Sequence, residues 1–184
     1  MITWSETQTR LRADRQRLVE HLAAEQGEPQ RFLALHPSYQ AVFFHRLSFY
    51  FFDHGHRLVG RFFWHINLLL TGCDIPPRCD LGGGLLLPVP LAVTLVGRFG
   101  RNCTVHAHVG VGGGSRRRDD IGAGPGLPVI GDGVEIGLNS LVVGPVRIGD
   151  GAHIGPGCLV TRDVPAGAEV MPVPRPTSGG SDGP

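Results

Sequence analysis

Large apolar residues recur at every sixth position over two stretches of the chain. The first series is Ile75, Leu81, Leu87, Val93, Phe99, Val105 and Val111, and the second is Ile130, Ile136, Val142, Ile148, Ile154 and Val160. Neither the 3.6-residue period of an α-helix nor the two-residue period of a strand produces this spacing. A six-residue repeat is typical of a parallel β-helix, in which each coil stacks on the previous one. The pattern therefore predicts a mainly β protein whose parallel β-helix has about five coils and covers residues 73–166.

A second periodic signal supports the coils. Four residues after each apolar position the side chain is small or apolar, as at Leu91, Gly97, Cys103 and Cys158. The four cysteines of the chain include no Cys-x-x-Cys pair, so we interpret those on the repeat as small core residues rather than as metal ligands.

The region before the coils, residues 1–72, has the pattern of helices. Polar and charged residues with Ala and Leu at helical spacing predict a helix around 5–26, and two apolar segments predict helices at 38–53 and 57–71. Neither apolar segment reaches the ~20 uninterrupted apolar residues of a membrane span. Because His45, Arg46, Arg57 and Arg61 lie within them, we expect buried packing rather than an interfacial membrane helix.

Two segments depart from the repeat. Residues 112–129 interrupt it with a run of Gly, Arg and Asp, which predicts a loop that protrudes from the coils and is a candidate for function. Residues 167–184 are rich in Pro, Gly and Ser and are expected to form a C-terminal tail.

The net charge and the residue composition reduce the number of functions that the chain could have. The formal net charge of +1 offers no global electrostatic attraction for nucleic acid. The N-terminus does not resemble a signal peptide, and the use of cysteine suggests a reducing compartment, so we expect a cytoplasmic protein.

Several segments resemble the serine O-acetyltransferase family of hexapeptide-repeat acyltransferases. In the helical region these are Tyr39-Gln40-Ala41, His45-Arg46-Leu47 and Gly55-His56-Arg57, and at the start of the coils Asp74-Ile75-Pro76-Pro77. Around the loop and in the last coil they are Val109-Gly110-Val111-Gly112-Gly113, Leu127-Pro128-Val129-Ile130-Gly131-Asp132 and Asp163-Val164-Pro165-Ala166-Gly167. The resemblance covers roughly residues 32–176.

This resemblance implies a left-handed β-helix that assembles as a homotrimer or a dimer of trimers. It also implies transfer of an acetyl group from acetyl-CoA, bound in a groove between subunits, to a small hydroxyl-bearing acceptor. A base must remove the hydroxyl proton as attack develops, and histidine suits this task near neutral pH.

The chain departs from the family at the catalytic positions. The family's base lies in a motif like Leu-x-His-x-x-Gly-Ile-Val, and the matching segment here places Val89 at the histidine. A second family histidine and the arginine before it match Leu127 and Gly126, and one of two acceptor-binding acids matches Ala23. The chain is therefore identified as a divergent member that lacks the family's catalytic histidine and has a degenerate active site.

Three residues remain as candidates for the acyl-transfer chemistry. His106 and His108 lie one coil beyond Val89 at positions where at least one faces outward, so either could be a relocated base. Asp74 matches the other acceptor-binding acid, although it could also be an acid that accepts backbone N–H groups where the helices meet the coils.

The residues matching the coenzyme groove are better retained: Gly137, Leu138, His153, Gly155 and Pro156. We assign no metal, because the two histidines at i, i+2 lack a complete third-ligand pattern for a zinc site between subunits. The alternative to an acetyltransferase is a non-catalytic β-helix trimer that acts as a scaffold or regulatory subunit.

Overall fold

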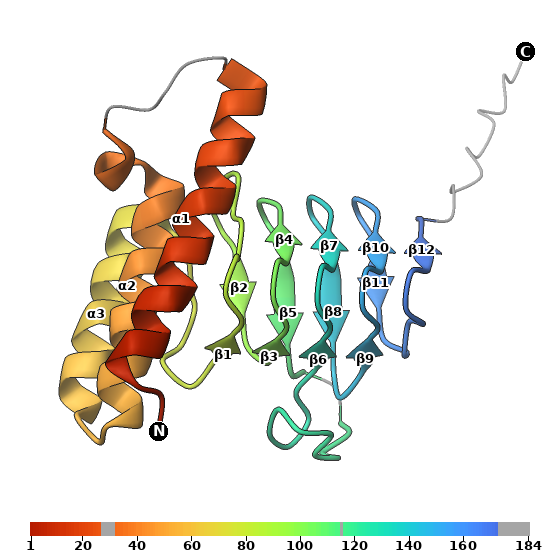
Figure 1. Ribbon diagram of the computed structural model, residues 1–184. Helices are drawn as coiled ribbons and strands as arrows, with labels where there is room; N and C mark the ends of the chain where they lie inside the picture. Colours follow the sequence, from red (N-terminus) through yellow and green to blue (C-terminus); the bar gives the residue numbers. More distant parts are fainter. Residues whose placement is uncertain (27–31, 115, 173–184) are drawn as a thin grey trace, which may run out of the picture.

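Three helices cover one end of a stack of short strands (Figure 1). The computed structural model describes residues 1–26, 32–114 and 116–172. The helices are α1 (Trp4–Gln26), α2 (Pro37–Asp53) and α3 (Arg57–Thr71), with the short 3₁₀-helix η1 (Leu33–Leu35) before α2. Pro37 begins α2, where a missing N–H is tolerated, and Gly72 ends α3 in the left-handed conformation (φ 68°). These helices confirm the three predicted from the sequence.

The strands form three parallel sheets, which we name A, B and C in the order in which the chain passes through them. Sheet A contains β2 (Thr94–Leu95), β5 (Gly110–Gly112), β8 (Leu141–Val143) and β11 (Leu159–Val160). Sheet B contains β1 (Asp80–Leu81), β3 (Arg98–Phe99), β6 (Val129–Ile130) and β9 (Arg147–Ile148). Sheet C contains β4 (Thr104–Val105), β7 (Glu135–Ile136), β10 (His153–Ile154) and β12 (Glu169–Val170).

One isolated bridge extends each sheet by a further rung: Asp74–Thr94 in sheet A, Ile148–Val164 in sheet B and Leu86–Thr104 in sheet C. The parallel β-helix of about five coils is thereby confirmed. Strand β12 lies beyond residue 166, so the coils continue into the segment that the sequence analysis assigned to the tail.

The core is a narrow column of the repeating apolar side chains. Leu81, Val105, Ile136 and Ile154, for example, expose 1% or less of their surface. All four cysteines are free and buried, as expected of small core residues. Burial raises the pKa of the Cys73 and Cys79 thiols to about 12, so both remain neutral and unreactive near pH 7.

The repeat is out of register at one corner. Leu95 pairs with Val111 in sheet A, although the six-residue repeat would place Val93 opposite Val111. The first coil therefore contains two residues more than the repeat predicts. Proline has no N–H for a ladder, and the segment Pro88–Pro90 forms a wide corner that the chain leaves through Ala92 at φ 54°. Val93 is nevertheless buried, whereas Leu91, expected to be a core position, is 53% exposed.

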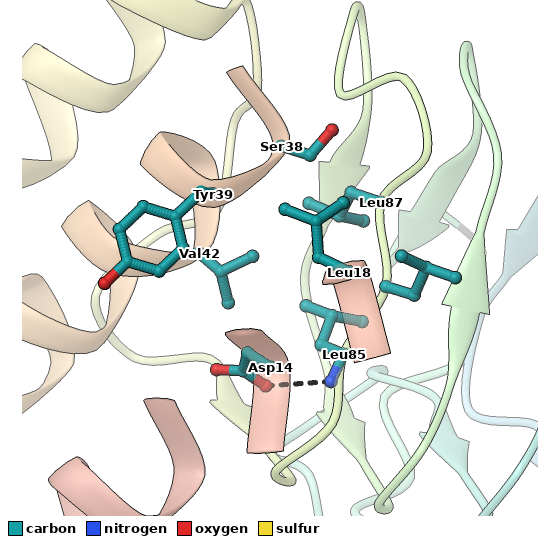
Figure 2. A pocket seen from close by; sticks show the side chains of 8 residues that line it. Asp14, Leu18, Ser38, Tyr39, Val42, Leu85 and Leu87 are labelled. Atoms are coloured by element: carbon teal, nitrogen blue, oxygen red, sulfur yellow. Dashed lines mark hydrogen bonds between the residues drawn. The ribbon is translucent and has the colours of Figure 1, made fainter. Parts of the chain in front are cut away.

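A buried ion pair joins α1, α2 and the first coil. The Asp14 carboxylate and the Arg46 guanidinium lie 2.9 Å apart with almost no exposure. Arg46 also donates to the carbonyls of Leu81 and Gly82, and Asp14 accepts the N–H of Leu85 at 2.8 Å (Figure 2). Charged groups this deep are tolerated because each is paired and hydrogen-bonded.

The apolar seam around this pair is closely packed. Leu18 of α1 and Val42 of α2 lie toward Leu85 and Leu87 of the first coil, whereas the ring of Tyr39 is directed away from these leucines (Figure 2). The space between them is too narrow for a water molecule. The ion pair is therefore shielded from solvent, which strengthens it.

The expectation of buried packing is wrong for helix α3. Its buried residues are the small or polar Gly60, Asn67 and Thr71, whereas Leu58 and Leu69 are 82% and 84% exposed. The reason is close approach to α2: a side chain at Gly60 would collide with the backbone of Ser48 and with Phe52. Ser48 donates to the Gly60 carbonyl and Asn67 to the Ala41 carbonyl. Phe63 stacks on Phe51 of α2, so polar contacts and one aromatic pair hold this interface, whereas Leu58 and Leu69 face outward.

His45 of α2 is fully buried against the first coil. The backbone at Ile75 and Cys79 faces its ring, yet neither ring nitrogen has a hydrogen-bond partner among the described residues. Burial, and next the charge of Arg46, lower the pKa of His45 to about 3. His45 is therefore neutral in the folded protein at pH 7.

Breaking the buried ion pair should destabilise the whole chain. Asp14→Ala leaves the Arg46 guanidinium buried without its partner, which we expect to cost about 3–5 kcal/mol of unfolding free energy in urea denaturation. Asp119→Ala removes the partner of the exposed Arg117 and should change the denaturation midpoint little. Equal effects of the two variants would contradict the assigned role of the buried pair.

His45 should make the protein less stable in acid. The unfolded state binds a proton at this residue below a pKa of about 6.5, whereas the folded state does not until about pH 3. We expect the unfolding free energy to fall as the pH drops between these values, by up to about 1.4 kcal/mol per pH unit. His45→Leu should flatten this dependence in denaturation measured at several pH values, and His65→Gln, at an exposed position of α3, should not. If the unfolding free energy of His45→Leu depended on pH as steeply as that of the wild-type protein, groups other than His45 would be the cause.

Candidate active site

The corner at which sheet C passes into sheet A holds most of the candidate residues. It comprises residues 88–93, 106–109, 137–140 and 155–158 in successive coils, and we call it the C–A corner. The N–H of His106 donates to the carbonyl of Ile136, and the N–H of Gly137 donates to that of Ile154. His106, Gly137 and Gly155 thus form one column, in which the candidate base is adjacent to the candidate coenzyme residues.

The side chains of His106 and His153 meet at a carboxylate between them. His106 Nε2 lies 3.0 Å from Glu135 Oε1, and His153 Nδ1 lies 3.4 Å from Glu135 Oε2. All three side chains are partly exposed on the outer surface. Two residues selected for different roles are therefore linked through an acid that the sequence analysis missed.

His108 is a turn residue of the same corner. Its backbone adopts φ 59°, as Asn139 does in the next coil, and its N–H donates to the Leu91 carbonyl. Its side chain is exposed. Both histidines thus face outward, and of the two it is His106 that contacts an acid.

The coenzyme candidates fall into two groups. Gly137 and Gly155 are buried, and a side chain at Gly137 would collide with the backbone of Gly155 and Pro156 in the next coil. Stacking of the coils is therefore a sufficient reason for glycine at Gly137. Leu138, Pro156 and His153 face outward and form the surface that a ligand can reach.

Asp74 lies apart from the histidines, at the first rung of sheet A. The indole N–H of Trp64, from α3, donates to its Oδ1 at 2.8 Å. Asp74 pairs with Thr94, which pairs with Gly110, so it lies two rungs from the strand after His108, or roughly 10 Å at the usual strand spacing. The structure does not bring Asp74 into contact with His106 or His108.

A surface hollow of about 350 Å³ lies beside Val89. Its walls are the start of α2, the end of α3 and the wide corner, namely His36, Pro37, Ser38, Leu70, Thr71 and residues 88–91. His36 caps α2 by accepting the N–H of Ser38 at Nδ1, and Ser38 donates to the Pro88 carbonyl. Burial, and to a lesser extent the charge of His21, lower the pKa of His36, so it is neutral near pH 7. No motif in the sequence distinguishes His36 from the other histidines of the helical region.

The loop between β5 and β6 emerges at the corner between sheets A and B and lies outside the coils (Figure 1). Asp120 holds its turn by accepting the N–H groups of Gly122 and Gly124. Arg147 donates to the Ile121 carbonyl at 2.8 Å, which ties the loop to sheet B. Gly126 and Leu127 are thus on a different corner from His106 within one chain.

The positions of Glu135 and His153 could have been read from the coil length. The two residues are one coil apart, in register in sheet C, and both immediately precede a core isoleucine. Residues that share a repeat position in successive coils stack on one face. His106 does not share this repeat position: Thr104 pairs with Glu135, and His106, which stacks on Gly137, reaches Glu135 diagonally from the preceding coil.

Two further properties of the described residues bear on the kind of site. Within residues 1–26, 32–114 and 116–172, no group of three or more His, Cys, Asp or Glu side chains could hold a metal ion. No helix in the described part of the chain is long and apolar enough to span a membrane.

Comparison with protein families and curated proteins indicates the relatives of the chain. Residues 128–162 match the family model described as bacterial transferase hexapeptide (six repeats). The serine acetyltransferase of Mycobacterium tuberculosis is 31% identical over 166 residues, which cover 86% of this chain and 70% of the relative. That of Synechococcus elongatus is 28% identical over 77% of this chain, but the match spans only 57% of the relative.

Solved structures agree with these relatives. Serine acetyltransferase from Neisseria gonorrhoeae, solved in complex with serine, has a TM-score of 0.75 at 27% identity, covering 92% of this chain and 68% of that one. The Brucella abortus enzyme, solved in complex with coenzyme A, has a TM-score of 0.78 at 23% identity, covering 93% and 67%, and shows the shared fold. Since repeat, helical region and overall fold all agree, the chain belongs to the serine acetyltransferase family of hexapeptide-repeat acyltransferases.

Proposed function

We propose that this chain is a CoA-dependent O-acetyltransferase that transfers an acetyl group from acetyl-CoA to a hydroxyl acceptor, either serine or another small molecule. The observation that carries the proposal is the column at the C–A corner, where His106 stacks next to Gly137 and Gly155. Membership of the serine acetyltransferase family supports the reaction class, and the relatives solved with serine and with coenzyme A support the two substrates.

His106 is the base in this proposal. The resemblance gives the family's catalytic histidine the position of Val89, whose side chain cannot accept a proton. His106 lies one coil further along the same corner and has a carboxylate partner, whereas His108 is an exposed turn residue. The active site would then be degenerate at the position of Val89, while the catalytic base would have moved to His106 rather than been lost.

The chemistry follows from these positions. The imidazole removes the proton of the acceptor hydroxyl as its oxygen attacks the thioester carbonyl. Backbone N–H groups are suitable donors for the oxyanion, because they are fixed in place before the reaction begins. The same imidazole then returns the proton to the departing thiolate.

The hollow beside Val89 is the proposed acceptor site. Its walls contain Pro37, Leu70, Val89 and Leu91, which favours an acceptor with an apolar portion over free serine. Asp74 is the acceptor-binding acid that the family resemblance implies, but it does not line this hollow, and the Trp64 indole occupies one of its carboxylate oxygens.

The proposed assembly is a homotrimer or a dimer of trimers. The loop with Leu127 and the column with His106 lie on different corners of one chain, so a neighbouring copy is needed to bring them together. Leu141 and Leu159 expose an apolar strip on the outer face of sheet A that a neighbour could cover. The outward apolar face of α3 suits contact between two trimers.

Acetyl-CoA should bind to the purified protein. Titration calorimetry, with serine present and absent, is expected to give an affinity in the micromolar range. Leu138→Glu should weaken binding, because it places a carboxylate in the proposed groove. Val19→Glu on α1 is the matched control, since Val19 and Leu138 are 42% and 45% exposed. No binding by the wild-type protein would favour the non-catalytic scaffold.

Turnover should depend on His106. In a screen of hydroxyl acceptors, His106→Ala should lower kcat by about a hundredfold, the usual contribution of a general base. His108→Asn retains a residue type that tolerates the left-handed turn and should have the smaller effect. Binding of acetyl-CoA without turnover of any acceptor would contradict the catalytic proposal.

A further inference from the structure

The outer face of sheet C carries a line of ionisable side chains, one from each of three successive coils. Glu135, His153 and Glu169 are in register on β7, β10 and β12. His106 follows β4 directly and leans across to Glu135. The register of the sheet stacks Glu135, His153 and Glu169, and His106 reaches Glu135 diagonally from the residue after β4.

The contacts within this line are specific in their atoms. One carboxylate oxygen of Glu135, Oε1, lies 3.0 Å from His106 Nε2. The other oxygen, Oε2, lies 3.4 Å from His153 Nδ1. The two imidazoles therefore use different oxygens and do not compete for one position.

These contacts determine which nitrogen of His106 carries a proton. An ionised carboxylate only accepts hydrogen bonds, so His106 Nε2 must be the donor in this pair. In a neutral imidazole the other nitrogen, Nδ1, then has the free lone pair. His106 thus presents a proton acceptor on the side of the ring away from Glu135.

We propose that Glu135 is the positioning residue of His106. This inference rests on the proposed function, in which His106 is the base, and adds the group through which that base is oriented. Glu135 holds the proton on Nε2, keeps Nδ1 free and stabilises the imidazolium that forms, as an acid behind a catalytic histidine does. His153, selected from the sequence as a coenzyme residue, instead holds the second oxygen of the carboxylate.

The proton and electron balance of the step is complete. The acceptor oxygen forms a bond to the acetyl carbon while its proton passes to His106 Nδ1. The carbon–sulfur bond of acetyl-CoA then breaks, and the thiolate takes that proton back from Nδ1. Throughout, the Nε2 proton stays between His106 and Glu135, and the carboxylate itself remains ionised.

Kinetics with a matched control test the inference. Glu135→Gln should lower kcat by about tenfold while the KM for acetyl-CoA is unchanged, because the lost charge acts on the transition state rather than on binding. Glu169→Gln removes a carboxylate from the same face without touching His106 and should leave kcat unchanged. In a His106→Ala background, Glu135→Gln should have no further effect, since both changes act on one step. Equal losses in the two Gln variants, or additive losses in the double variant, would overturn the proposal.

A second measurement does not need activity. In nitrogen-15 NMR spectra, the Nε2–H proton of His106 should be protected from exchange with water in the wild-type protein and lose that protection in Glu135→Leu. Glu169→Gln should leave it unchanged. Persistence of the protected proton in Glu135→Leu would falsify the pairing. A verified pair in a protein that acetylates no acceptor would instead count against the proposed function, so the two failures are distinguishable.

Discussion

The ion pair between Asp14 and Arg46 is the contact on which the rest of the structure depends. A parallel stack of coils has an open end whose backbone carbonyls need donors. Arg46 satisfies the carbonyls of Leu81 and Gly82, and Asp14 both holds the guanidinium and accepts the N–H of Leu85. Two helices that share no hydrogen-bond ladder with the coils are thereby joined to the first one. Each later coil then needs only its predecessor as a template.

The wide corner after Leu87 shows how a small local change decides the surface without disturbing the core. Two prolines cannot donate to a ladder, so the chain bows outward and returns to register only at Leu95. The later core residues keep their register because the next corner, between β2 and β3, is short and compensates for the two added residues. At the surface, Val89 and Leu91 are left beside His36 on the wall of a hollow. The corner that holds Val89 is therefore an irregular one, and its side chains lie on the surface.

One coil further along, regular stacking creates a different arrangement. The sheet C register stacks Glu135 on His153, and the C–A corner aligns His106 with Gly137 and Gly155, from where His106 reaches Glu135 diagonally. In a β-helix, side chains that are distant in sequence become neighbours on one face when they share a repeat position. An acid and a histidine that are distant in sequence can therefore meet on one face of the coils without a change of fold.

The sequence by itself determined the three helices, the coils and the identity of most core residues, because helical spacing and a six-residue period depend only on local chain geometry. It also selected His106 and His153. Three features were decided by the tertiary structure. The register shift at Leu95 depends on pairing between coils, and the outward apolar face of α3 depends on close packing of Gly60 against α2. The contact between His106 and Glu135 depends on coil stacking across a long loop that hides the repeat. Each is a contact between separate coils or helices, and a one-dimensional pattern does not record which residues of separate elements meet.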